Sequence, residues 1–151
     1  MCGDVLLIYK SDLVILTRKH EISTEGQGDA HDVTEVVARI VAESGMDEGA
    51  VTVFVVGSTA GVTTIEFEPG AIADLNRTFE SLAPRDGDYR HHQRWGDDNG
   101  SSHVRAALQG PSTVIPFQDG KLLLGTWQQL VLLEFDTRPR RRELIVQVAG
   151  E

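Results

Sequence analysis

The spacing of apolar positions along the chain predicts one helix clearly. Five valine and isoleucine residues recur with the 3.6-residue period of a helix that packs on one face: Val33, Val36, Val37, Ile40 and Val41. Asp32 and Glu35 resemble a capping box at its start, and Gly45 is suited to end it. Because valine is a mediocre helix former, packing on a sheet is expected to hold this helix.

A second helix is predicted to open at Pro69-Gly70 and to close before Pro84. Its inward residues are Ile72, Leu75, Phe79 and Leu82. The segment from Pro84 to Gly100 has almost no core-forming residues, so it is expected to be a surface loop or the wall of a pocket. A short helix from His103 to Gln109 follows.

The remaining apolar runs are short and rich in β-branched residues, which is typical of strands. Val51 to Val56 is predicted to be a central strand buried on both faces. A hairpin is predicted around Asp119-Gly120. The other predicted strands are Val5 to Tyr9, Leu13 to Thr17, Val62 to Phe67, Ser112 to Phe117, Lys121 to Leu124, Trp127 to Phe135 and Glu143 to Val148. Several strands with two main helices predict a β-rich α+β fold.

Length and composition bound the class of protein. A chain of 151 residues is expected to form a single domain over 1–151. It has no apolar run of roughly 20 residues, so no membrane span is predicted. The start of the chain lacks the features of a secretory signal and Cys2 is the single cysteine, so a cytoplasmic location is expected. The formal charge of −9, without a basic stripe, argues against nucleic acid as a partner.

Candidate chemistry is concentrated in one polar segment. Three of the five histidines, His91, His92 and His103, fall within thirteen residues, and Asp97, Asp98 and Asn99 lie between them. Imidazoles beside carboxylates suit a divalent metal such as zinc, and they also suit general acid–base work. The spacing matches no zinc-finger or His-Glu-x-x-His motif, and a solvated polar loop is the competing interpretation.

Two further places have residues suited to binding. Gly57-Ser58-Thr59-Ala60-Gly61 follows a strand, and its amides and hydroxyls could cradle an anion, although a plain turn is equally consistent. Gly125-Thr126-Trp127-Gln128 offers a hydroxyl, an indole and an amide for a small-molecule pocket, or a tryptophan for the core.

Charged residues in unusual positions complete the candidates. Glu66 stands beside Ile65 and Phe67, so it is either a buried base or metal ligand, or a residue that faces solvent. The arginines at 138, 140, 141 and 142 could bind phosphates, but pairing with acids on this acidic chain is favoured.

Together these segments resemble the YjbQ-like family in order and spacing. The matching stretches are Asp32-Val33-Thr34, Gly57-Ser58-Thr59-Ala60 with Glu66, Tyr89-Arg90-His91, Asn99-Gly100-Ser101-Ser102-His103, Leu108-Gln109-Gly110-Pro111-Ser112, Leu124-Gly125-Thr126-Trp127-Gln128 and Arg138-Pro139-Arg140. The resemblance implies an antiparallel β-sandwich that associates as a homotrimer, and a weak thiamine-phosphate-synthase-like transfer on a small phosphorylated substrate. The alternative is a non-catalytic metabolite- or metal-binding protein.

By the same resemblance, His91 and His103 would be pocket histidines that hold a divalent metal, zinc or magnesium, with Glu66, Asp98 and Asn99 beside them as catalytic groups. The ligand-binding residues would be Ser58, Thr59, Tyr89, Thr126, Trp127 and Gln128. Gly57 stands where many bacterial members have a histidine, which is similar to the archaeal-type branch. His92 stands where asparagine is more usual. A three-histidine site is therefore not carried over to this chain.

Overall fold

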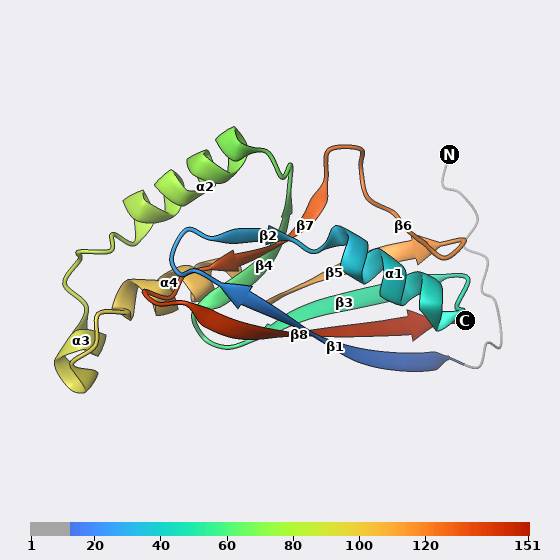
Figure 1. The fold of residues 1–151 in the computed structure, drawn as a ribbon, viewed down its shortest axis with the longest axis horizontal. Coiled ribbons are helices and arrows are strands. Elements are labelled where there is room, and N and C mark those ends of the chain that lie inside the picture. The colour runs from blue at the N-terminus through green and yellow to red at the C-terminus, as the bar shows by residue number, and fades with distance from the viewer. Residues whose placement is uncertain (1–12) are drawn as a thin grey trace, which may run out of the picture.

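Residues 13–151, which the computed structural model describes, form two antiparallel sheets packed face to face (Figure 1). The larger sheet has five strands in the order β1 (Val14–Thr24), β8 (Arg140–Gly150), β3 (Gly49–Val56), β5 (Ser112–Gln118) and β6 (Lys121–Leu122). The smaller sheet has three strands in the order β2 (Ala30–Asp32), β7 (Gln129–Glu134) and β4 (Ala60–Ile65). The predicted antiparallel sandwich is confirmed. The predicted strand at 5–9 and Cys2 lie outside the described residues.

Among the described residues there are four helices. The two longest, α1 (Thr34–Ser44) and α2 (Pro69–Leu82), are the two that the apolar spacing predicts. α3 (Arg90–Trp95) falls within the segment predicted as loop or pocket wall, and α4 (Gly100–Gln109) begins three residues before the predicted short helix. No helix in this part of the chain has the length and apolar character needed to cross a bilayer.

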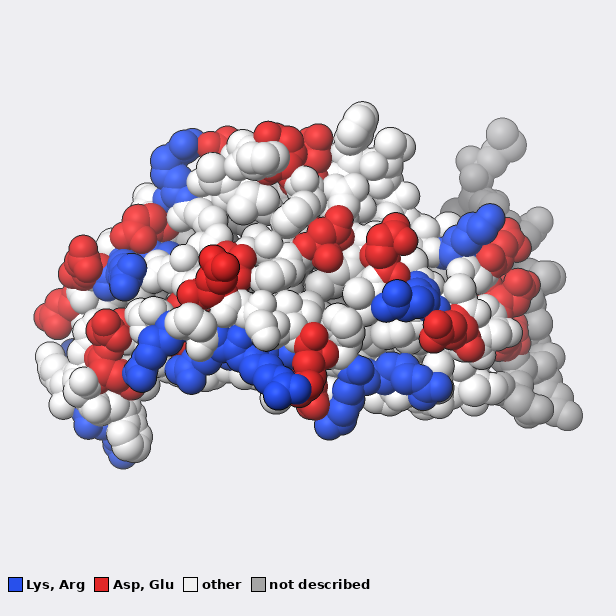
Figure 2. Space-filling model, in the orientation of Figure 1, with Lys and Arg blue, Asp and Glu red and all other residues white. Residues whose placement is uncertain are grey.

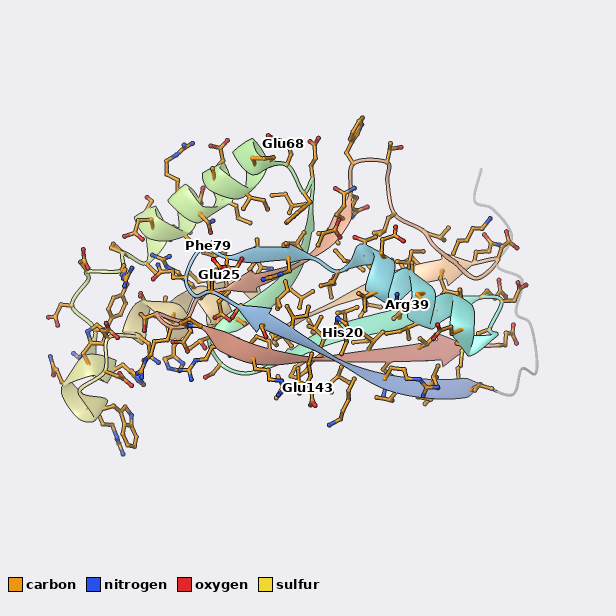
Figure 3. The ribbon with its side chains drawn as sticks, in the orientation of Figure 1. His20, Glu25, Arg39, Glu68, Phe79 and Glu143 are labelled. Carbon is orange, nitrogen blue, oxygen red and sulfur yellow. The ribbon has the colours of Figure 1, made fainter. Side chains whose placement is uncertain are left out.

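The core lies in two layers because the smaller sheet is covered on both faces. Between the sheets, Val37 and Val41 of α1 pack with Val53, Leu132 and Val146, all fully buried. On the other face of β7, Val131 and Leu133 pack against α2 and α4. Phe79 projects from α2 toward this layer (Figure 3), and its ring lies 4.8 Å from that of Phe135.

The larger sheet is buried on one face only, which corrects the prediction for β3. Val51, Val53 and Val55 are fully buried, but the alternate residues Phe54 and Val56 are 38% and 46% exposed. Successive strand residues point to opposite faces, and α1 covers only the inner one. The continuous apolar run therefore marks a half-buried strand whose outer face is unusually apolar.

Two local predictions have different outcomes. The β5–β6 hairpin is confirmed: Asp119 and Gly120 have φ values of 52° and 64°, as a type I′ turn requires. The capping box is wrong. The N-cap of α1 is Val33, which makes no side-chain capping bond, and Asp32 instead accepts a hydrogen bond from the backbone N–H of Thr34 at 2.9 Å.

The charged residues are mixed rather than grouped by sign on the face drawn in Figure 2. Several pair across strands β1 and β8, as Lys19 does with Glu143 at 3.2 Å and Arg141 does with Glu21. Exposed pairs of this kind add little to stability. Three of the four arginines between 138 and 142 pair with acids: Arg140 with Asp136, Arg141 with Glu21 and Arg142 with Glu134.

Candidate functional site

Helices α3 and α4 bring two histidines together. The ring centroids of His91 and His103 lie 4.6 Å apart, with 52° between the ring planes. His91 Nε2 is 3.4 Å from Oδ1 of Asp97. The chain can make this approach because Gly96, at φ 66°, ends α3 in the left-handed conformation and turns the chain back toward α4. Two partly buried imidazoles and a carboxylate therefore form one cluster, which we call the histidine pair.

The His92 side chain is not part of the histidine pair and instead stabilises the start of α4. Its Nε2 accepts a hydrogen bond from the backbone N–H of Gly100 at 3.1 Å, at the first residue of α4. This bond requires an unprotonated Nε2, so the neutral ring is the form that stabilises the start of the helix. Tyr89, predicted to bind ligand, packs 5.5 Å from the His92 ring, and its hydroxyl donates to the carbonyl of Pro84.

Several buried oxygens at the start of α4 have no hydrogen-bond partner among the described residues. They are Asp97 Oδ1, Asn99 Oδ1, Ser101 Oγ and Ser102 Oγ. Both serines are fully buried. An unsatisfied buried polar group costs about 1–3 kcal/mol, so four in one stretch of six residues are not explained by packing. Such a group of oxygens is what a polar ligand or ordered water would satisfy.

A pocket of about 280 Å³ lies beside the histidine pair. Its lining is Gly57, Ser58, Ala60, His103, Ala106, Ala107 and Pro111. A second, more open depression of about 540 Å³ lies along Gly96, Asp97, Asp98, Thr137 and Arg138. Small-molecule sites are commonly about 300–1,000 Å³, so both are of the right order. Asp98 lies at the rim, where its Oδ1 accepts a hydrogen bond from Thr137.

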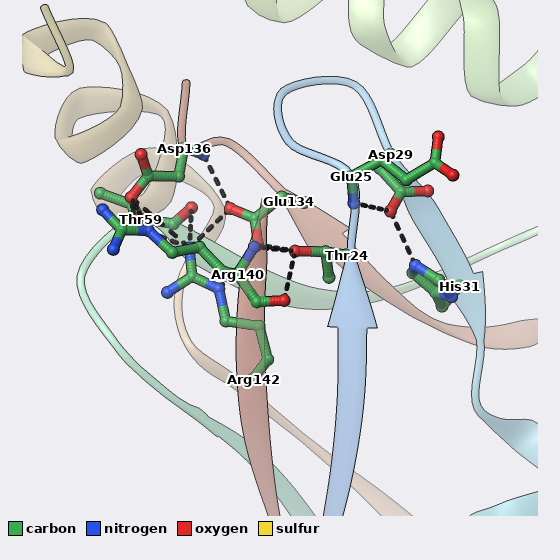
Figure 4. Close-up of polar contacts among 9 residues, drawn as sticks. All are labelled: Thr24, Glu25, Asp29, His31, Thr59, Glu134, Asp136, Arg140 and Arg142. Carbon is green, nitrogen blue, oxygen red and sulfur yellow. Dashed lines mark hydrogen bonds and ion pairs between the residues drawn. The ribbon is translucent and has the colours of Figure 1, made fainter. Parts of the chain in front are cut away.

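Beneath the Gly57–Gly61 segment lies a buried ionic network (Figure 4). Arg142 donates from Nε and Nη2 to the two carboxylate oxygens of Glu134, at 2.7 and 2.5 Å. Glu134 also accepts from the hydroxyl of Thr24 and from the backbone N–H of Asp136. Arg140 donates to Asp136 at 2.8 Å. The network joins β1, β7 and β8 at the end of the sandwich where α4 lies.

Thr59 belongs to this network and not to the pocket surface. Its side chain is buried, and its hydroxyl donates to Asp136 and accepts from Arg142 Nη2 at 2.7 Å. The segment is also not a hairpin turn, because it carries the chain from β3 in one sheet to β4 in the other. Burial raises the pKa of Asp136, but its hydrogen bonds from Arg140 and Thr59, with the charges of Arg140 and Arg142, outweigh this and hold that pKa below its ordinary value.

Four predicted site residues are not brought to the histidine pair within one chain. Glu66 lies just beyond the end of β4 and is exposed. Thr126, Trp127 and Gln128 lie in the loop between β6 and β7, which Figure 1 shows well away from α3 and α4. Trp127 is 72% exposed, so it fills no core, and the Gln128 amide donates to the Thr64 hydroxyl. Sequence order alone could not reveal this separation.

The sequence analysis also missed residues that the structure brings to the site. Glu134 is the one acid within an apolar strand, a signal that could have pointed to a buried ion pair. The burial of Ser101 and Ser102 has no such signal, since small polar residues at a helix start are common. Within residues 13–151, no three His, Cys, Asp or Glu side chains converge closely enough to hold a metal ion.

The class of protein is thus an α+β sandwich of two antiparallel sheets, with a polar site on helices α3 and α4 at one end of the sandwich. The chain belongs to the YjbQ-like family: the family model described as UPF0047 protein YjbQ-like matches residues 18–151. A UPF0047 protein of Synechocystis is 37% identical, with 89% of this chain and 94% of that protein covered. One from Methanothermobacter thermautotrophicus is 33% identical, with 99% and 98% covered.

Solved structures agree with this assignment. A YbjQ-like protein of Sulfolobus solfataricus is similar with a TM-score of 0.81 and 29% identity, over 91% of this chain and all of that chain. A protein of the same family from Clostridium acetobutylicum gives a TM-score of 0.77 and 33% identity, over 87% and 98%. The predicted family and fold are thereby confirmed.

Proposed function

We propose that the pocket beside the histidine pair binds a small phosphorylated molecule, and that the protein catalyses a transfer reaction of that molecule or its hydrolysis. The reaction to assay first is the one that the family resemblance suggests, in which thiazole phosphate and a pyrimidine pyrophosphate are joined with release of pyrophosphate. The observation that supports a reactive site is the contact between His91 and His103, one of which lines the pocket.

The chemistry proposed for these residues is proton transfer and charge stabilisation. His103 reaches the pocket and would give a proton to the departing oxygen. His91 packs on His103 and has the Asp97 carboxylate at 3.4 Å, so a second ring and a carboxylate stand directly behind the group that reaches the pocket. Asn99, Ser101 and Ser102 are buried next to the pocket lining and not part of it, so their unpartnered oxygens would act on the substrate through an ordered water.

We also propose that the site binds a divalent cation, zinc or magnesium, although the protein supplies only part of the ligand set. When a cation is bound, His91 and His103 would supply two ring nitrogens to it instead of transferring a proton, and the described chain supplies no complete set of acidic or imidazole ligands around them. Water or substrate oxygens would have to complete the shell, as is usual for catalytic sites. A bound cation would neutralise the phosphate charge.

The direct test is a turnover assay with the purified protein and the two phosphorylated half-molecules. Product and pyrophosphate are followed after treatment with a chelator and again after adding zinc or magnesium. Turnover that exceeds a no-protein control and depends on both half-molecules supports the proposal. If neither binding nor turnover occurs with these or with simpler phosphate esters, the proposal is wrong.

Replacing Ser102 with alanine tests whether the buried oxygens belong to the site. The Ser102 hydroxyl is fully buried without a partner among the described residues, so its removal is expected to leave the free energy of unfolding unchanged or to raise it by up to about 1 kcal/mol. Affinity for the phosphorylated molecule should fall. Urea denaturation and calorimetric titration measure the two effects, with Ser44→Ala as a control remote from the site. A loss of stability with unchanged affinity would contradict a binding part for Ser102.

The alternative function is a non-catalytic binding protein that forms a homotrimer. The outer face of the five-stranded sheet favours self-association. Phe54, Val56, Val114 and Ile15 lie on this face, and they are between 38% and 59% exposed. An apolar face on a short acidic chain is commonly covered by another subunit.

Phe54→Asp is expected to convert such a trimer to a monomer, because a charge at the centre of an apolar interface is not solvated. Light scattering after gel filtration measures the mass. Leu82→Asp is the matched control, since Leu82 is 64% exposed on α2, away from this face. A variant with unchanged mass, or a wild-type chain that is already monomeric, would argue against this interface.

A further inference from the structure

The guanidinium group of Arg142 has one nitrogen that the buried network leaves free. Nε and Nη2 donate to Glu134, and Nη2 also donates to the hydroxyl and carbonyl of Thr59. Nη1 makes no hydrogen bond to any acceptor in the part of the chain that the structure describes. The side chain is only 8% exposed, so this donor is held in place and largely removed from water.

Gly57 is the residue that lies over this free nitrogen. A Cβ added at Gly57 would lie 2.8 Å from Arg142 Nη1, which is closer than real Cβ atoms approach. The arginine cannot swing aside easily, because Glu134 and Thr59 hold its other two nitrogens. Gly57 also has a φ of 142°, which other residues rarely adopt. Arg142 itself is not part of the lining of the pocket, so its Nη1 reaches the pocket only past Gly57, which has no side chain to stand in the way.

We infer that Arg142 Nη1 binds an oxygen of a phosphate or pyrophosphate group in the pocket lined by Gly57, Ser58 and His103. This inference deepens the proposed function and depends on it for the rest of the substrate. The guanidinium would face the anion from below Gly57, with the Ser58 hydroxyl and the His103 ring on the same pocket wall. Charge-assisted hydrogen bonds from a buried arginine are among the stronger ones that a protein makes to phosphate.

The local charge allows this binding. Arg140 and Arg142 balance Glu134 and Asp136 within the network, so the four groups together carry no net charge. Arg142 therefore needs no further anion to be stable. A ligand anion can bind at its Nη1 and leave again without unbalancing the charges of the network. The network also positions the guanidinium before the ligand arrives, which lowers the entropy lost on binding.

Gly57→Ala tests the inference because it replaces none of the charged residues of the network and puts a methyl group against Arg142 Nη1. We expect the wild-type protein to bind sodium pyrophosphate and inorganic phosphate in calorimetric titrations, and Gly57→Ala to bind them at least about 10-fold more weakly, the loss expected for one charged hydrogen bond. Gly45→Ala is the matched control: Gly45 also has positive φ, but a Cβ there meets nothing within 4 Å. Equal pyrophosphate affinity in Gly57→Ala and wild type would overturn the inference.

A measurement on the wild-type chain removes dependence on the folding of that variant. With ¹⁵N-labelled arginine, the side-chain signals of Arg142 should shift on addition of pyrophosphate and not on addition of acetate at equal ionic strength. Arg142→Lys identifies the signals. If acetate shifts them equally, the site is a general anion site and the phosphate assignment is wrong. If neither ion shifts them, the inference is overturned.

The outcomes separate this inference from the proposed reaction. Pyrophosphate binding that is weakened by Gly57→Ala, in a protein without turnover, supports the Arg142 site and counts against catalysis. Turnover that Gly57→Ala leaves unchanged, together with unchanged pyrophosphate binding, overturns the Arg142 site and leaves the reaction standing.

Discussion

Replacing Glu134 with alanine is expected to lower the free energy of unfolding by about 3–5 kcal/mol. The substitution removes both carboxylate oxygens that pair with Arg142, whose side chain is only 8% exposed and is therefore largely shielded from bulk solvent. It also leaves the Asp136 backbone N–H without its acceptor and the Thr24 hydroxyl with only the Arg140 carbonyl at 3.2 Å. Urea denaturation followed by circular dichroism measures the change.

Glu143→Ala is the control for this experiment, because Glu143, which follows Arg142 on β8, pairs with Lys19 of β1 at the surface. Removing that pair is expected to change stability by less than about 1 kcal/mol. The double change Glu134→Leu with Arg142→Met should cost less than Glu134→Ala alone, since it leaves no unpaired charge. A loss below about 1 kcal/mol for Glu134→Ala would show that the guanidinium finds water or another partner at once, and the network would then not be a stabilising element.

The histidine pair gives the second large effect. If the proposed transfer is the reaction, His103→Ala is expected to lower turnover by about 10²–10⁴-fold, the usual contribution of a positioned acid or base. Stability should change little, because the ring is only partly buried and makes no hydrogen bond within the described residues. Steady-state turnover and thermal denaturation measured on the same preparation separate the two effects.

His20→Ala is the matched control, since His20 lies on β1 away from the site (Figure 3) and is also partly buried. Combining His91→Ala with His103→Ala should add little to the loss from His103→Ala alone if the two rings act as a unit. Turnover within a few-fold of wild type in His103→Ala would remove the pair from the mechanism and favour the binding-protein alternative.

The sequence led us to expect His91 and His103 close together, and the structure brings their rings into contact. This contact required only that the intervening segment fold back, and Gly96 provides that turn. Their role as a site stays a prediction. Glu66 and Trp127 were also predicted to belong to this site. Their positions depend on where β4 ends and β7 begins, and the structure places both residues away from the histidine pair. Burial of Ser101 and Ser102 depends on packing by other elements, which no local pattern reports.

The sequence by itself determined two kinds of feature: those that depend on neighbouring residues, and the motifs shared with the family. The 3.6-residue period of α1, the Asp119-Gly120 turn and the motifs shared with YjbQ-like proteins follow from residue order, because helix faces and tight turns depend on near neighbours.

The tertiary structure alone decided which strand faces are buried and which charges meet. β3 reads as an apolar run, yet within residues 13–151 only one of its faces is covered, and Phe54 and Val56 on the other face are exposed. Arg142 meets Glu134 and Thr59 because strands β7 and β8 and the β3–β4 connection end at the same place. Such contacts join residues far apart in the chain, and their energy depends on the water that the surrounding structure excludes.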